Sequence, residues 1–308
     1  MTNPSAFSSA FRSLTGNAPF PWQEALFDRF IGIEPTSRFP DTCDIPTGLG
    51  KTSVIAVWVL ALAHHARNGS ARMFPRRLVY VVNRRTVVDQ STREAMQLRV
   101  ALRDRPELKD VADALRSLGS QPDCATASLA ISTLRGEFAD NAEWRDDPSR
   151  PAVVVGTVDM IGSRLLFNGY GRGFKSRPLH AAFLAQDALL VHDEAHLEPA
   201  FQVLVEAICK EQQLYAWEKD RFHVMALSAT ARSGSSSFTL TARDLEDSTV
   251  IKRINAKKGI AFHHIEDGKK ISDAVAALAL HDDFKESGQA ILIFVQQVKD
   301  VEVVADHL

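Results

Sequence analysis

The stretch from Ile45 to Thr52 constrains the fold of this chain more than any other. It reads Ile-Pro-Thr-Gly-Leu-Gly-Lys-Thr and joins a short β-forming run, 42–45, to the strongly apolar segment 52–66. Gly48 and Gly50 permit a tight turn whose N–H groups can surround phosphate oxygens, and a following helix adds its positive end. The order strand, loop, helix therefore predicts a phosphate-binding loop within an α/β fold.

Each position of this loop has an expected role. Lys51 is the point charge for the outer phosphates, and the Thr52 hydroxyl is a ligand for Mg²⁺. The strict pattern has Gly or Ala where this chain has Ile45, but both loop glycines are present. An ordinary glycine-rich turn is the alternative interpretation. The expected nucleotide-binding residues of the loop are Pro46, Thr47, Gly48, Leu49, Gly50, Lys51 and Thr52.

A second motif, Asp193-Glu194-Ala195-His196, follows the apolar run 188–191. Such a run is typical of a buried strand in a parallel sheet, and open α/β sheets place their chemistry at the carboxyl ends of strands. Asp193 is expected to hold Mg²⁺, and Glu194 to orient the attacking water as a catalytic residue with Lys51. Adjacent acids after a strand are often only solvated, so the upstream loop is what favours a catalytic role.

Composition agrees with a soluble cytoplasmic protein that does not enter a membrane. Of 308 residues, 45% are hydrophobic, and the net charge is −2, so no global basic signature is present. The three cysteines are far apart and lack metal-ligand spacing, which favours free thiols in a reducing compartment. The N-terminus has no apolar signal core, and the longest apolar run, 54–63, is too short to cross a bilayer.

Basic residues are concentrated in two tracts. Ten arginines but three acids lie between Arg67 and Arg105, and the segment 160–186 holds four basic residues and no acid. Together they favour a surface for a nucleic-acid backbone, although solvated faces are the alternative. Tyr170 and Phe174, in the second tract, are candidates to stack on bases or to anchor their loop.

Apolar runs and helical periodicities alternate along the chain. Strands are expected at 78–83, 126–132, 152–155, 188–191 and 224–227, with helices at 86–103, 158–166 and 200–214. This alternation predicts a mostly parallel sheet with helices on both faces. A polar linker is expected around Ser233–Ser237. Strands at 260–265 and 290–295, a helix at 272–280 and a terminal helix then begin a second α/β unit.

The order of these motifs resembles superfamily 2 DExH helicases. Their spelling resembles the CRISPR-associated helicase of type I systems, a helicase–nuclease family, and within it the subtype I-U (also I-G) branch. The segments that carry the resemblance cover nearly the whole chain: 19–23, 46–52, 78–90, 132–136, 155–164, 193–196, 228–230 and 291–295.

The resemblance implies a RecA-like P-loop NTPase lobe over 1–240, then a linker and the start of a second RecA-like lobe over 241–308. It implies ATP and Mg²⁺ as ligands, single-stranded DNA as the track, and recruitment by a Cascade-like CRISPR surveillance complex in antiviral defence. Because the arginines that a second lobe supplies are not reached, we expect a fragment with weak ATP binding and negligible unwinding. His192-Asp193 and His281-Asp282 are not taken as nuclease ligands, since a metal site needs several convergent ligands.

The resemblance also implies residue roles. Gln23 would read the adenine edge, with Phe20 or Trp22 nearby, and a polar helix start is the alternative for Gln23. Residues His196, Ser228 and Thr230 would couple hydrolysis to movement. The implied nucleic-acid contacts are Arg84, Arg85, Arg135, Gly136, Gly156, Thr157 and Arg164.

Two other functions stay open. The chain could belong to a different superfamily 2 motor that acts on DNA or RNA. It could also be only a nucleotide-dependent, nucleic-acid-binding module without motor activity.

Overall fold

The computed structural model describes residues 4–33, 38–121, 127–135, 143–169, 173–215, 222–228, 237–256, 259–281 and 291–308. It divides the chain into two compact units, Met1–Asn255 and Ala256–Leu308. The predicted identities of the two parts, a complete first lobe and the start of a second, stay predictions.

A seven-stranded sheet organises the first unit. The strand order is β3-β4-β2-β5-β6-β1-β7, and all the pairings are parallel. The predicted mostly parallel sheet is confirmed, and its strands all end at one side, here called the carboxyl edge. The strands are β1 (Thr42–Asp44), β2 (Arg77–Val82), β3 (Ala130–Leu134), β4 (Ala152–Thr157), β5 (Ala188–Asp193), β6 (Phe222–Ser228) and β7 (Ser237–Thr239).

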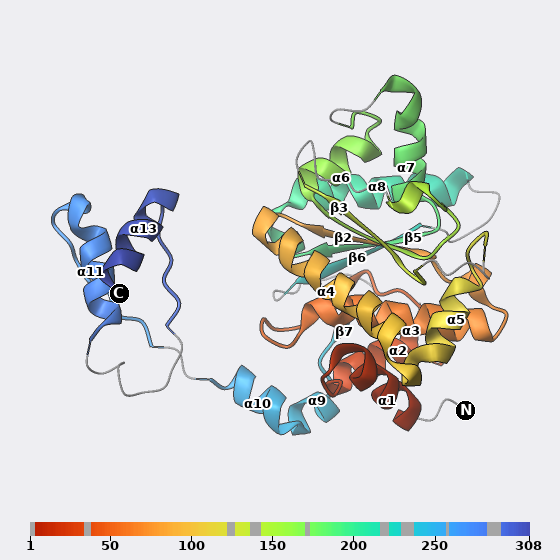
Figure 1. The fold of residues 1–308 in the computed structure, drawn as a ribbon, viewed down its shortest axis with the longest axis horizontal. Helices are drawn as coiled ribbons and strands as arrows, with labels where there is room; N and C mark the ends of the chain where they lie inside the picture. The colour runs from red at the N-terminus through yellow and green to blue at the C-terminus, as the bar shows by residue number, and fades with distance from the viewer. Residues whose placement is uncertain are drawn as a thin grey trace. The chain divides into compact units, whose positions relative to one another are not determined.

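Helices cover both faces of this sheet (Figure 1). Side chains of β2 alternate between two cores: Tyr80 belongs to the larger one, and Val79 and Val81 belong to the smaller one. A strand whose two faces are both buried explains the continuous apolar run in the sequence. Helices α1 (Pro4–Thr15), α2 (Pro21–Phe30), α3 (Val54–Arg67), α4 (Arg85–Asp104) and α5 (Lys109–Arg116) contribute to the larger core, and α6 (Val158–Leu165), α7 (Arg177–Ala185) and α8 (Pro199–Tyr215) to the smaller.

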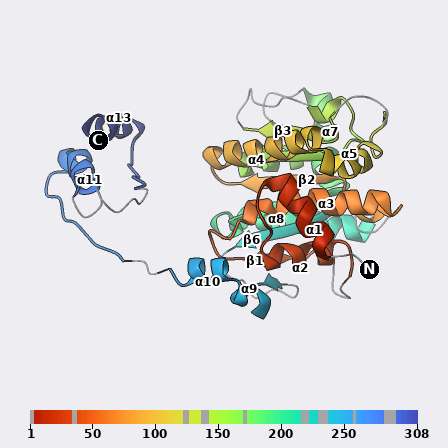
Figure 2. The ribbon, with the colours of Figure 1, turned by 60° about the horizontal axis from the view of Figure 1, so that its bottom comes forward.

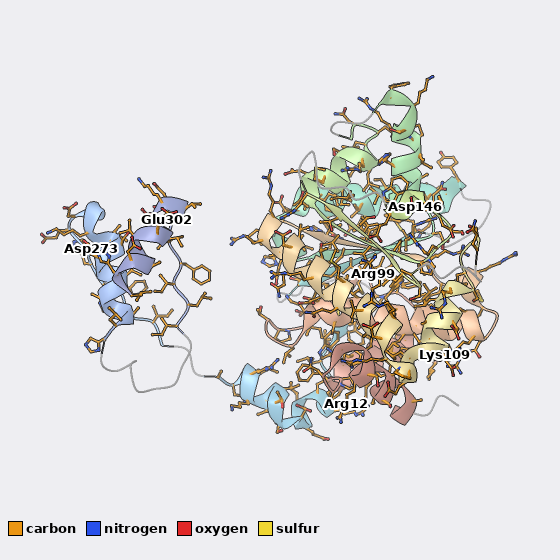
Figure 3. All side chains as sticks on the ribbon, viewed as in Figure 1. Arg12, Arg99, Lys109, Asp146, Asp273 and Glu302 are labelled. Atoms are coloured by element: carbon orange, nitrogen blue, oxygen red, sulfur yellow. The ribbon has the colours of Figure 1, made fainter. Side chains whose placement is uncertain are left out.

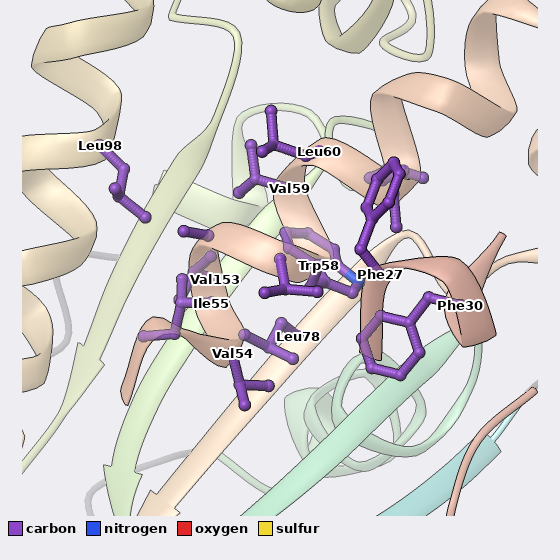
Figure 4. Packing of buried hydrophobic residues seen from close by; sticks show 14 of the residues in the cluster. Phe27, Phe30, Val54, Ile55, Trp58, Val59, Leu60, Leu78, Leu98 and Val153 are labelled. Carbon is purple, nitrogen blue, oxygen red and sulfur yellow. The ribbon is translucent and has the colours of Figure 1, made fainter. Parts of the chain in front are cut away.

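Helix α3 is apolar around most of its circumference because other elements surround it. Trp58 is fully buried, and its indole N–H donates to the Pro75 carbonyl oxygen at 3.1 Å. Figure 4 shows Ile55 and Trp58 of α3 among Leu78 and Val153 of the sheet and Phe27 and Phe30 of α2. None of the described helices has the length and apolarity that crossing a membrane requires. The longest apolar run is therefore a core helix, as predicted.

The last elements of the first unit pack against elements near its start. Strand β7 pairs with β1, and the short helices α9 (Ala242–Glu246) and α10 (Ser248–Ile254) follow it, with α9 packed against α2 (Figure 2). The linker predicted around Ser233–Ser237 is therefore wrong at its end, where Ser237 opens β7; residues 233–236 lie outside the described residues. The strand was missed because a three-residue strand carries almost no pattern of its own.

The second unit is helical in its described part. Helices α11 (Ile271–Ala279) and α13 (Val298–His307) pack together through the buried Ala276 and Val304. Asp273 of α11, labelled in Figure 3, lies 3.6 Å from the His307 ring. The strands predicted at 260–265 and 290–295 are wrong for the described residues 260–265 and 291–295. A strand needs a hydrogen-bonding neighbour, and the described part of this unit supplies none, so these apolar side chains stay exposed.

Candidate nucleotide site and arginine-lined edge

The sheet brings the two sequence motifs together at the carboxyl edge. Only β6 separates β1, which leads into the loop, from β5, which ends at Asp193. The Ile45 N–H extends the β1–β6 ladder by donating to the Ser228 carbonyl oxygen at 3.1 Å. As a result Lys51 and Glu194, 143 residues apart in sequence, form an ion pair with 2.7 Å between Nζ and Oε1.

Part of the phosphate loop is buried in the core, and the rest is exposed. Ile45 and Leu49 are fully buried, whereas Thr47, Gly48 and Gly50 are exposed. Gly48 has φ 87° and Gly50 has φ 73°, a left-handed backbone that residues with a Cβ rarely adopt. The position of Ile45 in the core explains why the strict sequence pattern can be broken there, while the two glycines meet a backbone requirement.

Lys51 stands where the loop becomes helix. It opens a 3₁₀ turn, Lys51–Ser53, that runs into α3, and its side chain is 8% exposed. Its partner Glu194 has φ 51°, and the Glu194 N–H donates to Asp193 Oδ1 at 3.1 Å. A left-handed non-glycine residue costs about 1 kcal/mol or more, and such strain is found preferentially at functional sites. The sheet therefore fixes Glu194 at the position where it meets the lysine.

Tyr80 joins Asp193 to Thr52. The fully buried Tyr80 hydroxyl donates to Asp193 Oδ2 at 2.8 Å and also hydrogen-bonds the Thr52 side chain. Burial raises the pKa of Asp193 above its ordinary value, while the Tyr80 hydrogen bond and Lys51 lower it. Burial and the neighbouring Asp193 raise the pKa of Tyr80 far above 10, so the phenol stays protonated and keeps donating.

These oxygens suit a magnesium ion. A carboxylate and a hydroxyl are the hard ligands that Mg²⁺ prefers, and here one tyrosine holds both. Sequence reasoning named Asp193 and Thr52 but missed Tyr80. The available signal was a tyrosine inside the otherwise aliphatic run 78–82 of β2.

His196, the last residue of the acidic motif, lies near both Glu194 and Ser228 of β6. Its Nδ1 is 3.5 Å from both Ser228 Oγ and Glu194 Oε2. The coupling role predicted for His196 and Ser228 stays a prediction, and Thr230 lies outside the described residues.

Gln23 braces the loop from α2. It is 3% exposed, its Oε1 accepts from the Phe20 N–H at 2.8 Å, and its Nε2 donates to Ser53 Oγ at 2.5 Å. The bond from the Phe20 N–H is one that a polar residue makes at a helix start, which was the alternative interpretation of Gln23. Trp22 is fully buried and donates to the Leu49 carbonyl oxygen at 3.1 Å, which leaves Phe20 as the half-buried aromatic ring beside the loop.

The carboxyl edge has a second half. We call the ends of β5, β6 and β1 the nucleotide half and the ends of β3, β4 and β2 the arginine half. Arg84 and Arg85 are exposed at the start of α4, directly after β2. Arg135 follows β3 and pairs with Asp89 of α4. Three predicted nucleic-acid contacts thus share one side of the sheet; Gly136 and Tyr170 lie outside the described residues.

The other predicted contacts serve the packing of α6. Thr157 caps this helix by accepting from the Met160 N–H at 3.4 Å. A Cβ on Gly156 would lie 3.0 Å from Ile161, so a larger residue would require the Ile161 side chain of α6 to shift. Arg164 is 2% exposed and donates to the Met160 carbonyl oxygen at 3.0 Å. A nucleic acid could reach the Arg164 guanidinium only if the side chain left this position. Phe174, by contrast, is 81% exposed beside Arg177.

A parallel sheet that sets this loop beside an acidic strand end defines a RecA-like α/β fold of the P-loop class. Residues 18–233 match the family model described as "Type III restriction enzyme, res subunit" (ResIII), and the chain belongs to this superfamily 2 helicase-like family. The match confirms the coarser part of the family resemblance stated above. No match was found among curated proteins.

Several solved structures are similar at low identity. The DEAD-box helicase Mss116 bound to ssRNA and UDP-BeF shares 15% identity over 75% of this chain and 42% of its own, with TM-score 0.47. The Pyrococcus furiosus Hef helicase domain shares 17% over 87% and 46%, with TM-score 0.43. A nuclease-deletion mutant of the type ISP restriction-modification enzyme LlaGI, in complex with a DNA substrate mimic, shares 13% over 85% and 22%, with TM-score 0.40. The chain spans less than half of each.

Proposed function

We propose that this chain is the ATP-binding part of a nucleic-acid motor, a helicase or translocase that hydrolyses ATP with Mg²⁺. The observation that supports this best is the 2.7 Å ion pair between Lys51 and Glu194. The pair places Lys51, the cation of the phosphate loop, beside Glu194, which directly follows the proposed Mg²⁺ ligand Asp193. Membership of a helicase-like family supports the same class of activity.

The geometry suggests how the residues act. The loop N–H groups and Lys51 bind the phosphates, so Lys51 exchanges its carboxylate partner for phosphate oxygens. Glu194 is thereby released to orient the attacking water. Asp193 and Thr52 hold Mg²⁺, which when bound neutralises charge on the outer phosphates.

The arginine half is the proposed track for the nucleic acid. Arg84 and Arg85 are exposed cations on the same edge as the nucleotide half. Phosphate contacts of this kind grip the backbone without reading sequence. A motor needs the two functions side by side, and β2 of the arginine half pairs directly with β5 of the nucleotide half.

The more specific proposal is a DNA helicase of CRISPR interference that moves 3′ to 5′ on single-stranded DNA and is recruited by a surveillance complex. The sequence resemblance over 78–90 and 155–164 supports it. A different superfamily 2 motor, acting on DNA or RNA, accounts equally well for the family match.

One assay tests the general proposal. ATP hydrolysis by the 308-residue chain is measured alone, with single-stranded DNA and with RNA, beside Lys51→Ala. We expect weak nucleotide binding by this chain and a further loss of nucleotide affinity of about 100-fold or more in Lys51→Ala, because removing a charge-assisted phosphate contact costs several kcal/mol. Unchanged ATP binding by Lys51→Ala would refute the proposal.

A second assay separates the two specific candidates. Stimulation by DNA, together with preferential binding to a surveillance complex loaded on its target rather than to free DNA, supports the CRISPR role. Stimulation by RNA alone, or indifference to the loaded complex, supports another motor.

A further inference from the structure

Helix α8 is fixed on the sheet by its inner face. Phe201 and Val205 are buried in the smaller core, and Gln212 Nε2 donates to the Ala185 carbonyl oxygen at the end of α7 at 2.7 Å. In Figure 1, α8 lies with α6 and α7 on the side of the sheet that holds this core. Because the inner face is fixed, the opposite face of α8 points away from the sheet.

The outward face of α8 carries a regular stripe. Positions 200, 203, 207, 210 and 214 alternate spacings of three and four residues, the a/d pattern of paired helices. We call this stripe the α8 seam; it consists of Ala200, Val203, Ala207, Lys210 and Leu214. All five residues are exposed, Val203 by 64% and Leu214 by 65%. The solvent face of a surface helix is ordinarily polar, so an exposed apolar stripe indicates an interaction surface.

The shape of the α8 seam suits a second helix. Its first and last residues are about 21 Å apart along the axis, at 1.5 Å per residue, which is the reach of four helical turns. The small side chains of Ala200 and Ala207 leave hollows beside Val203 and Leu214. In paired helices, larger side chains of the partner insert into such hollows.

The charges beside the α8 seam indicate which helix fits. Glu206 flanks the seam on one side and Glu211 on the other, and both are exposed. Residues at these flanking positions set partner choice in paired helices. Two copies of α8 would bring acid against acid in either orientation, and such like charges repel. A helix with basic flanks is complementary instead.

We propose that the α8 seam is the docking surface for an amphipathic helix of another protein. The apolar stripe of that helix is flanked by lysine or arginine residues, which pair with Glu206 and Glu211, and an acidic residue faces Lys210. The proposal goes beyond the proposed function and does not depend on ATP binding.

The test uses two synthetic helical peptides of about 18 residues, long enough to cover the seam. Both have a leucine and alanine stripe with one glutamate to face Lys210, and they differ only in lysine or glutamate at the flanks. Fluorescence anisotropy measures their binding to the 308-residue chain. We expect the lysine-flanked peptide to bind about tenfold or more tightly than the other, with a preference that shrinks as salt rises.

Two double variants test the surface itself. Val203→Ser with Leu214→Ser should weaken binding of the lysine-flanked peptide about tenfold or more, because the apolar contact is lost. The matched control is Met96→Ser with Val100→Ser, which makes the same kind of change at exposed apolar residues of α4. The control should bind as the wild type does.

Glu206→Lys with Glu211→Lys should reverse the preference, so that the glutamate-flanked peptide binds more tightly. This variant leaves the seam intact and decides the question if melting curves show that the serine variant is unfolded. The proposal is overturned if neither peptide binds, if both bind equally, or if the α8 and α4 serine variants lose the same affinity. A wild-type dimer in sedimentation velocity that Val203→Ser with Leu214→Ser dissociates would also overturn it, since the occupant would then be a second copy.

Discussion

The two halves of the carboxyl edge use the same sheet in opposite ways. In the nucleotide half, side chains pair with one another: Lys51 with Glu194, and Tyr80 with Asp193. In the arginine half, Arg84 and Arg85 extend into solvent. The difference fits the proposed functions, in which a small triphosphate is bound by fixed geometry and a polymer by exposed charge. Strand β2 contributes to both halves, with Tyr80 on one side and Arg84 at its end.

The largest expected effect lies in the nucleotide half. Glu194→Gln should keep ATP binding but lower hydrolysis by about 10²- to 10⁴-fold, because an amide cannot accept the proton of the attacking water. Stopped-flow phosphate release beside nucleotide titration measures this. The affinity for single-stranded nucleic acid should not change, and a variant that hydrolyses ATP at the wild-type rate would remove Glu194 from the chemistry.

A comparable change in the arginine half should leave the nucleotide alone. Arg84→Ala with Arg85→Ala should weaken nucleic-acid binding about 10- to 100-fold and reduce the slope of log affinity against log salt by about 1–2, as expected for two lost phosphate contacts. Fluorescence anisotropy at several salt concentrations measures both.

The matched control is Arg103→Ala, an exposed arginine near the far end of the same helix, paired with Asp104. It should bind nucleic acid as the wild type does. Equal losses in Arg103→Ala and the double variant would mean that general charge, not the carboxyl edge, holds the polymer.

A smaller effect is expected where the halves meet. Tyr80→Phe removes the hydroxyl that holds Asp193 and Thr52, so the Mg²⁺ concentration needed for tight ADP binding should rise about tenfold. Titration of ADP affinity against Mg²⁺ measures this, with exposed Tyr215→Phe as control. ADP affinity without Mg²⁺ should be unchanged, and a loss there as well would show that the phenol shapes the loop and not the metal ligands.

The smallest effect concerns the fold beneath both halves. Burial lowers the pKa of His65 below 6.5, with Nδ1 2.8 Å from Ser70 Oγ and Nε2 3.1 Å from the Phe30 carbonyl oxygen. The unfolded chain therefore binds the proton first, and stability falls as pH drops below 6.5. His65→Gln should reduce this fall by up to about 1.4 kcal/mol per pH unit.

Urea unfolding between pH 7 and 5 measures the slope, with exposed His263→Gln as control. An unchanged slope in His65→Gln would assign the acid sensitivity elsewhere. Either result gives the dependence of stability on pH, which is needed to interpret how nucleotide and nucleic-acid binding change with pH.

Sequence patterns predicted the structural features that depend on residues close together along the chain. The loop, the acidic motif and the buried strands carry local signals, and the strand alternation was enough to predict a parallel sheet. Tyr80 was missed because its role depends on β2 lying beside β5. The hydrogen bond from Arg253 to the Gly48 carbonyl oxygen was missed because 205 residues separate the two. Arg164 reads as an exposed basic residue in sequence, but α6 turns it inward.

The wrong strand predictions of the second unit have a related cause. Apolar β-forming runs become strands only if a partner strand is available. The strands of the first unit have such partners in six parallel pairings, and the described residues 260–265 have none. The same composition therefore gave a correct prediction in one unit and an incorrect one in the other.

The strand order also determines when each strand can pair during synthesis on the ribosome. Strand β1, which carries the loop, ends at Asp44, yet its ladder partners β6 and β7 begin at Phe222 and Ser237. At about 5–20 residues per second of synthesis, β1 waits on the order of ten seconds or more for its first backbone partner. Because non-local parallel pairing is slow, the loop strand stays open to mispairing during this interval. The strand that carries the loop is thus synthesised well before the strands that complete its pairing.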